Sequence, residues 1–183
     1  MIQVRRPITA EVQIRPVAEG ELALLEECFP EGGPAKHAER LARQQKGEVV
    51  YLIAWQLGEP VGHALLNWRG SQDEHVARQL QAACPDIEDL FVLADLRSRG
   101  IGRQLLSAGE KLAIEQGFTM IGLSAGAEQG DPARRLYERL GYRDAQFGEY
   151  TECGAYVDTQ GSRKTWEATC VYLIKDLISY DEP

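Results

Sequence analysis

Apolar and polar residues alternate along the chain with the periods of strands and helices. Residues 12–17 alternate strictly, which predicts a half-buried strand, and Pro16 places it at a sheet edge or near its end. Residues 21–28 carry apolar side chains at helical spacing, and a mostly polar second helix is expected over about 35–45. The chain is therefore expected to begin with a strand and two helices.

Two neighbouring strands are predicted next. Residues 49–57 and 61–68 are rich in β-branched, aromatic and aliphatic side chains, and residues 58–60, Gly-Glu-Pro, connect them tightly. This pattern predicts an antiparallel hairpin. The polar stretch over 69–85, with a short helix over 75–83, is interpreted as an insertion that could wall a substrate pocket.

The middle of the chain has the pattern of a parallel crossover. A strand over 87–93 is followed by an amphipathic helix over 102–116, which Gly117 ends, and by a strand over 119–124. Strands joined through a helix in this way are parallel, and the connection is right-handed.

The last third begins with the most clearly delimited helix. Asp131 and Pro132 suit the N-cap and the first helical position, and Gly141 ends the helix. A closing antiparallel hairpin is predicted from residues 154–158 and 164–175. The sum is a mixed α/β (α+β) sheet flanked by helices, antiparallel at both ends with one parallel βαβ crossover between.

Length and charge limit the function classes. The 183 residues, 44% of them hydrophobic, fit a single globular domain over 1–183. The excess of 28 Asp and Glu over 20 Lys and Arg gives a net charge of −8, which disfavours nucleic acid and acidic membrane surfaces as partners. That charge either attracts a cationic substrate or only keeps the protein soluble.

Cysteine spacing and hydropathy favour a cytoplasmic protein without a metal. The four cysteines show no C-x-x-C spacing and lie near no histidine at metal-ligand spacing, so we expect no metal site. The first residues lack the apolar stretch of a secretion signal, and no membrane-spanning run of apolar residues occurs. The thiols are therefore expected to be reduced core side chains rather than nucleophiles.

The segment over 93–103 lies between a strand and a helix N-terminus, where free N–H groups and the helix dipole attract anions. The P-loop pattern is absent, and the dinucleotide fingerprint would need glycine where Leu105 stands. On spacing alone, an ordinary helix start remains the alternative to a phosphate site. Two glycines and three arginines surround the turn: Gly100, Gly102, Arg97, Arg99 and Arg103.

The wider pattern resembles the GNAT acetyltransferases. Residues 97–102, R-S-R-G-I-G, fit that family's pyrophosphate-binding pattern [QR]-x-x-G-x-[GA], and residues 131–142 resemble its second motif, L-Y-x-x-x-G-[FY]. The resemblance is close over 87–142 and rests on element order elsewhere. It implies the GNAT fold and an acetyl-CoA-dependent N-acetyltransferase. One departure is Gly130, which stands where the second motif often has Asn, and it puts the contacts of that Asn in doubt.

The resemblance also implies where acetyl-CoA binds. In that family the diphosphate rests on the amides of the loop, and the pantetheine lies along the central strand like an added strand. The residues expected to contact the cofactor are Leu90, Phe91, Val92, Arg97, Ser98, Arg99, Gly100, Ile101, Gly102 and Arg103.

Transfer to an amine requires a base, because an amine with a pKa of about 10.4 is protonated at pH 7. Glu88 is the candidate, since residues 87–92 resemble the strand of spermidine/spermine acetyltransferases whose glutamate acts through water. Asp89 is the alternative base, and both are ordinary strand carboxylates if neither acts. Because adjacent strand residues face opposite sides, we expect only one of the two to point into a pocket.

Tyr137 matches the family tyrosine that protonates the coenzyme A thiolate, although on an apolar helix face it could serve only as core. The resemblance implies direct attack in a ternary complex, with no covalent intermediate on a cysteine. The expected acceptor is a small cationic amine such as a polyamine or aminoglycoside. The alternatives are a protein N-terminus or lysine, and a non-catalytic acetyl-CoA-binding regulatory module; a homodimer is a further option.

Overall fold

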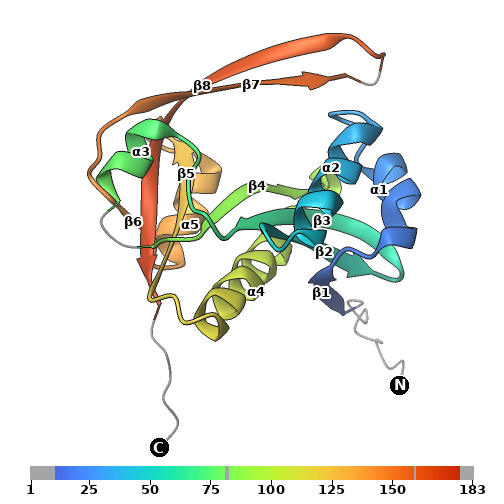
Figure 1. The fold of residues 1–183 in the computed structure, drawn as a ribbon, viewed down its shortest axis with the longest axis horizontal. Helices are drawn as coiled ribbons and strands as arrows, with labels where there is room; N and C mark the ends of the chain where they lie inside the picture. The colour runs from blue at the N-terminus through green and yellow to red at the C-terminus, as the bar shows by residue number, and fades with distance from the viewer. Residues whose placement is uncertain (1–10, 81–82, 159, 178–183) are drawn as a thin grey trace, which may run out of the picture.

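A mixed β-sheet with helices on both faces forms the body of the protein in the computed structural model, which describes residues 11–80, 83–158 and 160–177 (Figure 1). Within these residues the strand order is β1-β2-β3-β4-β5-β8-β6, and β7 pairs with β8. β4 and β5 are parallel, and the other pairs are antiparallel. The predicted mixed α/β class with a parallel crossover is confirmed.

The N-terminal elements follow the sequence prediction closely, except at one turn. Gln56 pairs with Glu59, so the connection is a two-residue turn at Leu57 and Gly58, rather than the predicted residues 58–60. Pro60 consequently lies inside the strand, opposite Trp55. The elements are β1 (Val12–Pro16), α1 (Leu22–Cys28), α2 (Pro34–Gln45), β2 (Val49–Gln56) and β3 (Glu59–Asn67).

The crossover lies where the sequence predicts it. The insertion before it contains a helix that begins after Asp73, whose carboxylate accepts hydrogen bonds from the backbone N–H groups of His75 and Val76. That helix ends at Gln79, earlier than predicted; residues 81 and 82 of the predicted helix lie outside the described residues. The elements are α3 (Glu74–Gln79), β4 (Asp86–Val92), α4 (Ile101–Glu115) and β5 (Met120–Gly126).

The C-terminal elements include one strand that the sequence pattern did not predict. Asp131 caps α5 as expected, because its Oδ1 accepts a hydrogen bond of 2.7 Å from the backbone N–H of Arg134. The short strand β6 adds an edge beside β8, and the closing hairpin is longer than its pattern predicts. The elements are α5 (Pro132–Arg139), β6 (Arg143–Asp144), β7 (Tyr150–Val157) and β8 (Arg163–Asp176).

The two sheet faces build different parts of the core. Leu52 and Ala54 of β2 face a cluster that includes Leu105 and Leu106 of α4 and Tyr137 of α5. Leu105 and Leu106 are fully buried, which stabilises the fold by about 1.5–3 kcal/mol for each side chain. Helices α4 and α5 therefore cover one face of the sheet.

The opposite face carries two separate clusters. Leu25 and Leu41 of α1 and α2 pack on β2 and β3, whereas Val76 of α3 packs with Tyr150 and Tyr172 of β7 and β8. Residues of β4 line an open pocket on this face. The sheet thus presents its central strand at the bottom of a gap in its own helical cover.

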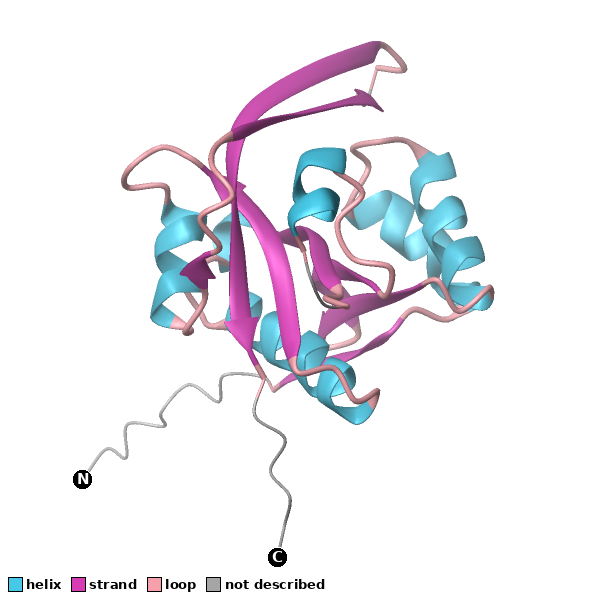
Figure 2. Cartoon of the chain, turned by 60° about the vertical axis from the view of Figure 1, so that its left-hand side comes forward, coloured by secondary structure: helices cyan, strands magenta, loops and turns pink. Residues whose placement is uncertain are grey.

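The closing hairpin projects far beyond the sheet. The C-terminal half of β8 pairs with β5 as far as Cys170, while its N-terminal half pairs with β7. We call this projecting part, residues 151–157 and 163–169, the arm (Figure 2). The arm crosses above β4, and the carbonyl of Val157 accepts a hydrogen bond of 2.9 Å from the N–H of Gly32, in the loop before α2.

Candidate active site

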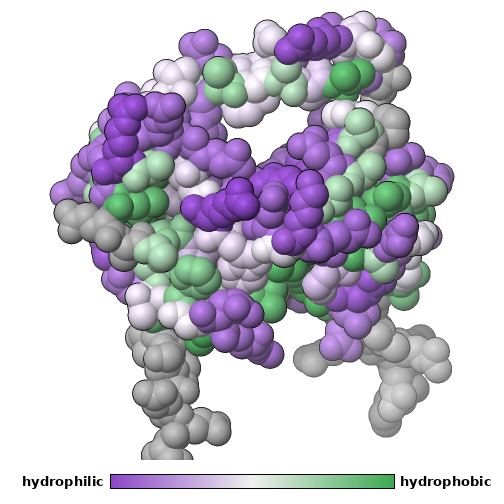
Figure 3. Space-filling view, in the orientation of Figure 1, coloured by the Kyte–Doolittle hydropathy of each residue, from purple (hydrophilic) through white to green (hydrophobic). Residues whose placement is uncertain are grey.

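A pocket of about 750 Å³ lies between the arm and β4. Figure 3 shows the hollow beneath the arm, framed by hydrophilic side chains. Strand β4 forms its floor, and α2 and the arm form its walls. The floor contains Asp86, Glu88 and Asp89, and the walls include Lys36, Arg40, Arg43, Glu152, Tyr156 and Trp166.

Glu88 and Asp89 both face this pocket, so the prediction that only one of them would do so is wrong. Leu65 of β3 pairs with Glu88 and His63 pairs with Phe91, which leaves two residues of β4 opposite the single Ala64. This is a β-bulge, and Asp89 has a φ of +50° within it. The bulge interrupts the alternation of side chains and turns two consecutive carboxylates to one side.

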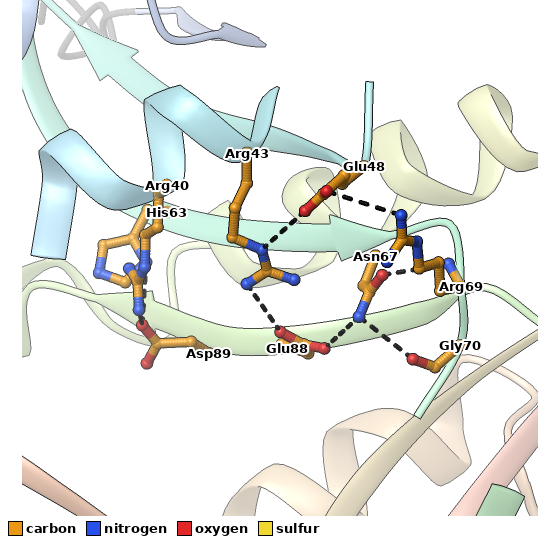
Figure 4. A network of polar contacts seen from close by, with 9 residues as sticks. All are labelled: Arg40, Arg43, Glu48, His63, Asn67, Arg69, Gly70, Glu88 and Asp89. Atoms are coloured by element: carbon orange, nitrogen blue, oxygen red, sulfur yellow. Dashed lines mark hydrogen bonds and ion pairs between the residues drawn. The ribbon is translucent and has the colours of Figure 1, made fainter. Parts of the chain in front are cut away.

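Glu88 is held from two directions. Asn67 Nδ2 donates a hydrogen bond of 2.7 Å to Glu88 Oε1, and Arg43 Nη1 lies 3.9 Å from Oε2 (Figure 4). Arg43 also approaches Glu48, which in turn contacts Arg69. The Glu88 side chain is 25% exposed, so a substrate can reach it while its position stays fixed.

Asp89 belongs to a neighbouring ion pair. Arg40 donates a hydrogen bond to its carboxylate and lies with its guanidinium carbon 5.2 Å from the centre of the Tyr51 ring. His63 Nδ1 lies 3.9 Å from the same carboxylate, and burial lowers the pKa of His63 to about 3, which keeps the imidazole neutral. The Asp89 side chain is 46% exposed, more open to solvent than Glu88.

Two further polar groups of the pocket were not predicted from the sequence. Asp86 is buried and accepts a hydrogen bond of 2.7 Å from the Tyr172 hydroxyl, and burial raises the pKa of Asp86 to about 8. Ser124 Oγ lies 2.7 Å from the Tyr150 hydroxyl and donates a hydrogen bond to Glu152. Only the pairing of β5, β7 and β8 brings these residues together, so no local motif could indicate them.

The predicted phosphate loop lies at the other end of β4. Gly100 is the N-cap of α4 with a φ of +85°, a conformation that favours glycine, and the N–H groups of the following turn have no intrahelical acceptor. Ser98, Arg99 and Gly100 are exposed. Arg97 instead turns back, and its Nε donates a hydrogen bond of 3.0 Å to the Val92 carbonyl.

The three sequence motifs meet beside β4. A Cβ atom at Gly102 would lie 3.6 Å from Leu136 of α5, 3.9 Å from Val92 and 4.0 Å from Leu90. Asp86 and Gly122 are the paired residues of β4 and β5 in the described chain, so the two strands diverge beyond them. This divergence leaves an edge of β4 without a strand partner between the loop and Glu88, where an extended ligand arm could add its own hydrogen bonds.

Tyr137 lies in the core on the α5 side of the sheet, outside the residues that line the pocket. Its ring centre is 6.1 Å from that of Tyr142, and its hydroxyl makes no hydrogen bond within the described residues. Burial raises the pKa of Tyr137 to about 12, so it carries its proton at neutral pH.

Neither a metal site nor a spanning helix is found in the parts of the chain that the structure describes. No group of three or more His, Cys, Asp or Glu side chains there is arranged to hold a metal ion. No helix there is long and apolar enough to cross a membrane.

Residues 20–142 match the model of the acetyltransferase (GNAT) family, which spans both predicted motifs and the bulged strand. The chain belongs to the GNAT acetyltransferase family. A curated GNAT relative, the aminoalkylphosphonate N-acetyltransferase of Salmonella typhimurium strain LT2, is 32% identical over 103 residues. The match covers 56% of this chain and 55% of the relative, so the chain spans about half the length of that protein.

Solved structures of GNAT proteins share the fold. An N-acetyltransferase from Staphylococcus aureus Mu50 superposes with a TM-score of 0.66 at 17% identity, over 92% of this chain and 100% of that one. The PaiA N-acetyltransferase from Thermoplasma acidophilum, solved with coenzyme A, gives 0.62 at 14% identity, over 91% and 99%. An aminoglycoside 6'-N-acetyltransferase with coenzyme A gives 0.59 at 17% identity, over 93% and 99%.

Proposed function

We propose that this protein is an acetyl-CoA-dependent N-acetyltransferase that acts on the primary amine of a small molecule. The observation that carries the proposal is the continuous path from the amides at the start of α4, along the unpaired edge of β4, to two carboxylates in a roofed pocket. Coenzyme A in two solved structures of the same fold supports the choice of cofactor.

The residues of this chain fit such a cofactor at both ends of the path. The exposed turn over 97–103 offers backbone N–H groups and arginines to a diphosphate, and acetyl-CoA would bring an activated thioester to the pocket. Arg97 now holds the Val92 carbonyl, and it would have to release that group for pantetheine to bond to Leu90, Phe91 and Val92. Arg97 is then free to reach a phosphate.

Glu88 is proposed as the base that removes a proton from the amine, directly or through water. Its fixed position between Asn67 and Arg43 supports this role, because a base must be held within hydrogen-bond reach of the proton it takes. Asp89 faces the same pocket, so it stays a competing candidate. Its ion pair with Arg40 makes it the weaker one, since that contact engages the carboxylate.

Tyr137 is proposed to donate a hydrogen bond to the departing sulfur. A phenol with a pKa of about 12 holds its proton more tightly than a thiol, whose pKa is about 8.5. Tyr137 would therefore stabilise the thiolate by a hydrogen bond more readily than by giving up its proton. Its hydroxyl is free to do so in the described structure.

The arm favours a small acceptor over a protein. Because Val157 bonds to Gly32, a folded protein would have to thread its lysine or N-terminus through a closed frame. The name of the aminoalkylphosphonate relative supports a small amine as well. A polyamine or an aminoglycoside remains a prediction from net charge, and the regulatory-module alternative predicts binding without turnover.

Two measurements test the proposal. Calorimetry with coenzyme A should show binding, and thiol release should follow when amines are added to the protein with acetyl-CoA. Peptides with free N-termini or lysines serve as the competing acceptors, and they should react at least about 100-fold more slowly in kcat/KM than the best small amine. Binding of acetyl-CoA with no turnover of any amine or peptide would support the module instead.

A further inference from the structure

One face of α2 presents a row of cations to the pocket. Lys36, Arg40 and Arg43 follow one another at spacings of four and three residues, which places them on one side of the helix. All three line the pocket opposite the arm. In a protein with a net charge of −8 this row is a local exception to the overall balance.

The three cations are not equally compensated. Arg43 and Arg40 pair with Glu88 and Asp89, but Lys36 has no ion pair within 4 Å and no hydrogen bond from its ammonium in the described residues. Burial and the nearby charge of Arg40 lower the pKa of Lys36, although Asp89 and Glu31 act weakly in the opposite direction. Lys36 is therefore a cation that an anionic ligand group would stabilise.

The opposite end of the pocket has the opposite chemistry. Glu88 accepts from Asn67 beside the divergence of β4 and β5, and Glu152 accepts from Ser124 on the arm side. Lys36 precedes Arg43, the partner of Glu88, by seven residues, or about 10 Å along the helix. The pocket therefore has an acidic end next to the proposed cofactor path and a cationic end two helical turns away.

We propose that the acceptor is a bifunctional amine that also carries an anionic group, a phosphonate or a carboxylate, which Lys36 binds while the amine lies beside Glu88. This inference rests on the proposed acetyltransferase function and narrows its substrate class. It differs from the expectation based on net charge, because a polyamine would place a second cation against Lys36. The distance between the two ends favours acceptors with three or more atoms between amine and anion.

The test compares four amines of similar length with the intact protein and acetyl-CoA: 3-aminopropylphosphonate, 4-aminobutyrate, butylamine and 1,4-diaminobutane. We expect kcat/KM for the phosphonate or the carboxylate to exceed that for butylamine by about 10- to 100-fold, the range of a charge-assisted hydrogen bond. The diamine should be the poorest substrate. The ratio of phosphonate to carboxylate then identifies which anion the site prefers.

A variant assigns the preference to Lys36. Lys36→Met keeps the length of the side chain and should lower the ratio of kcat/KM for the anionic amine to that for butylamine by at least about 10-fold, whereas Lys36→Arg should retain most of it. Lys111→Met, on the exposed face of α4, is the matched control and should change neither value. Pocket integrity is checked by coenzyme A affinity and thermal melting.

The possible failures can be told apart. If butylamine or the diamine is acetylated as well as the anionic amines, or if Lys36→Met leaves the ratio unchanged, the anion subsite is refuted while the acetyltransferase function stands. If coenzyme A binds but none of the four amines and no peptide is acetylated, the proposed function fails and the subsite falls with it.

Discussion

Replacing Glu88 by Gln removes the proposed base with little change of shape. Asn67 can still donate to the amide oxygen at position 88, and Arg43 keeps its contact with Glu48. If Glu88 takes the proton from the amine, kcat/KM at pH 7 should fall by about 10²- to 10⁴-fold, the contribution of general base catalysis. This corresponds to about 3–5 kcal/mol of lost transition-state stabilisation.

The fold should tolerate this change. The lost ion pair joins Glu88 and Arg43 at 3.9 Å, with both side chains about a quarter exposed, so it contributes about 1 kcal/mol or less. For a chain of this size that corresponds to a Tm shift of about 2–4 °C at most. A large loss of activity with a nearly constant Tm would therefore separate the chemical role of Glu88 from a structural one.

The pH dependence of thiol release gives the sharpest readout. An acceptor amine with a pKa of about 10.4 becomes its own free base as the pH rises, so the deficit of Glu88→Gln should shrink by at least about 10-fold between pH 7 and 9.5. Asp89→Asn is the matched comparison and should lose less activity at pH 7. The reasoning is refuted if Glu88→Gln stays within about threefold of the parent at pH 7, or if its deficit is constant with pH.

Three other changes have defined outcomes. Tyr137→Phe should lower kcat by about 10-fold or more with coenzyme A affinity nearly unchanged in calorimetry, and equal turnover would remove its role at the sulfur. Asp86 has a folded pKa of about 8, above its unfolded value, so its contribution to stability is present below about pH 4 and is lost as the pH rises to 8. Asp86→Asn should therefore flatten the fall of Tm between pH 5 and 8, and an unchanged slope would contradict that pKa. Gly122→Ala would place a Cβ atom 2.1 Å from the Tyr172 hydroxyl, so melting should show a loss of about 1–3 kcal/mol; a Tm within 1 °C of the parent would argue against this packing.

The sequence predicted most of the elements because their signals are local. Asp131 and Pro132 start α5, and Gly117 follows the end of α4, as their chemistry requires. The motif over 97–102 lies on the predicted turn before a helix. Apolar periodicity also identified the crossover, since it depends on residues close in the chain.

The organisation of the pocket could not be predicted in this way. The bulge at Asp89 depends on how β3 pairs with β4, and nothing in the order of residues 87–92 distinguishes a bulged strand from a regular one. The arm is likewise a tertiary feature, because its contact with Gly32 joins segments more than a hundred residues apart. Local patterns indicated the carboxylates, but only the paired strands reveal that both face one cavity.

A crystal structure with coenzyme A tests the central claim most directly. The account predicts that the diphosphate contacts the backbone N–H groups of the turn over 97–103, with Arg97 released from Val92 and the sulfur between β4 and β5 near Glu88. A diphosphate bound away from the start of α4, or a sulfur remote from the pocket beneath the arm, would contradict it.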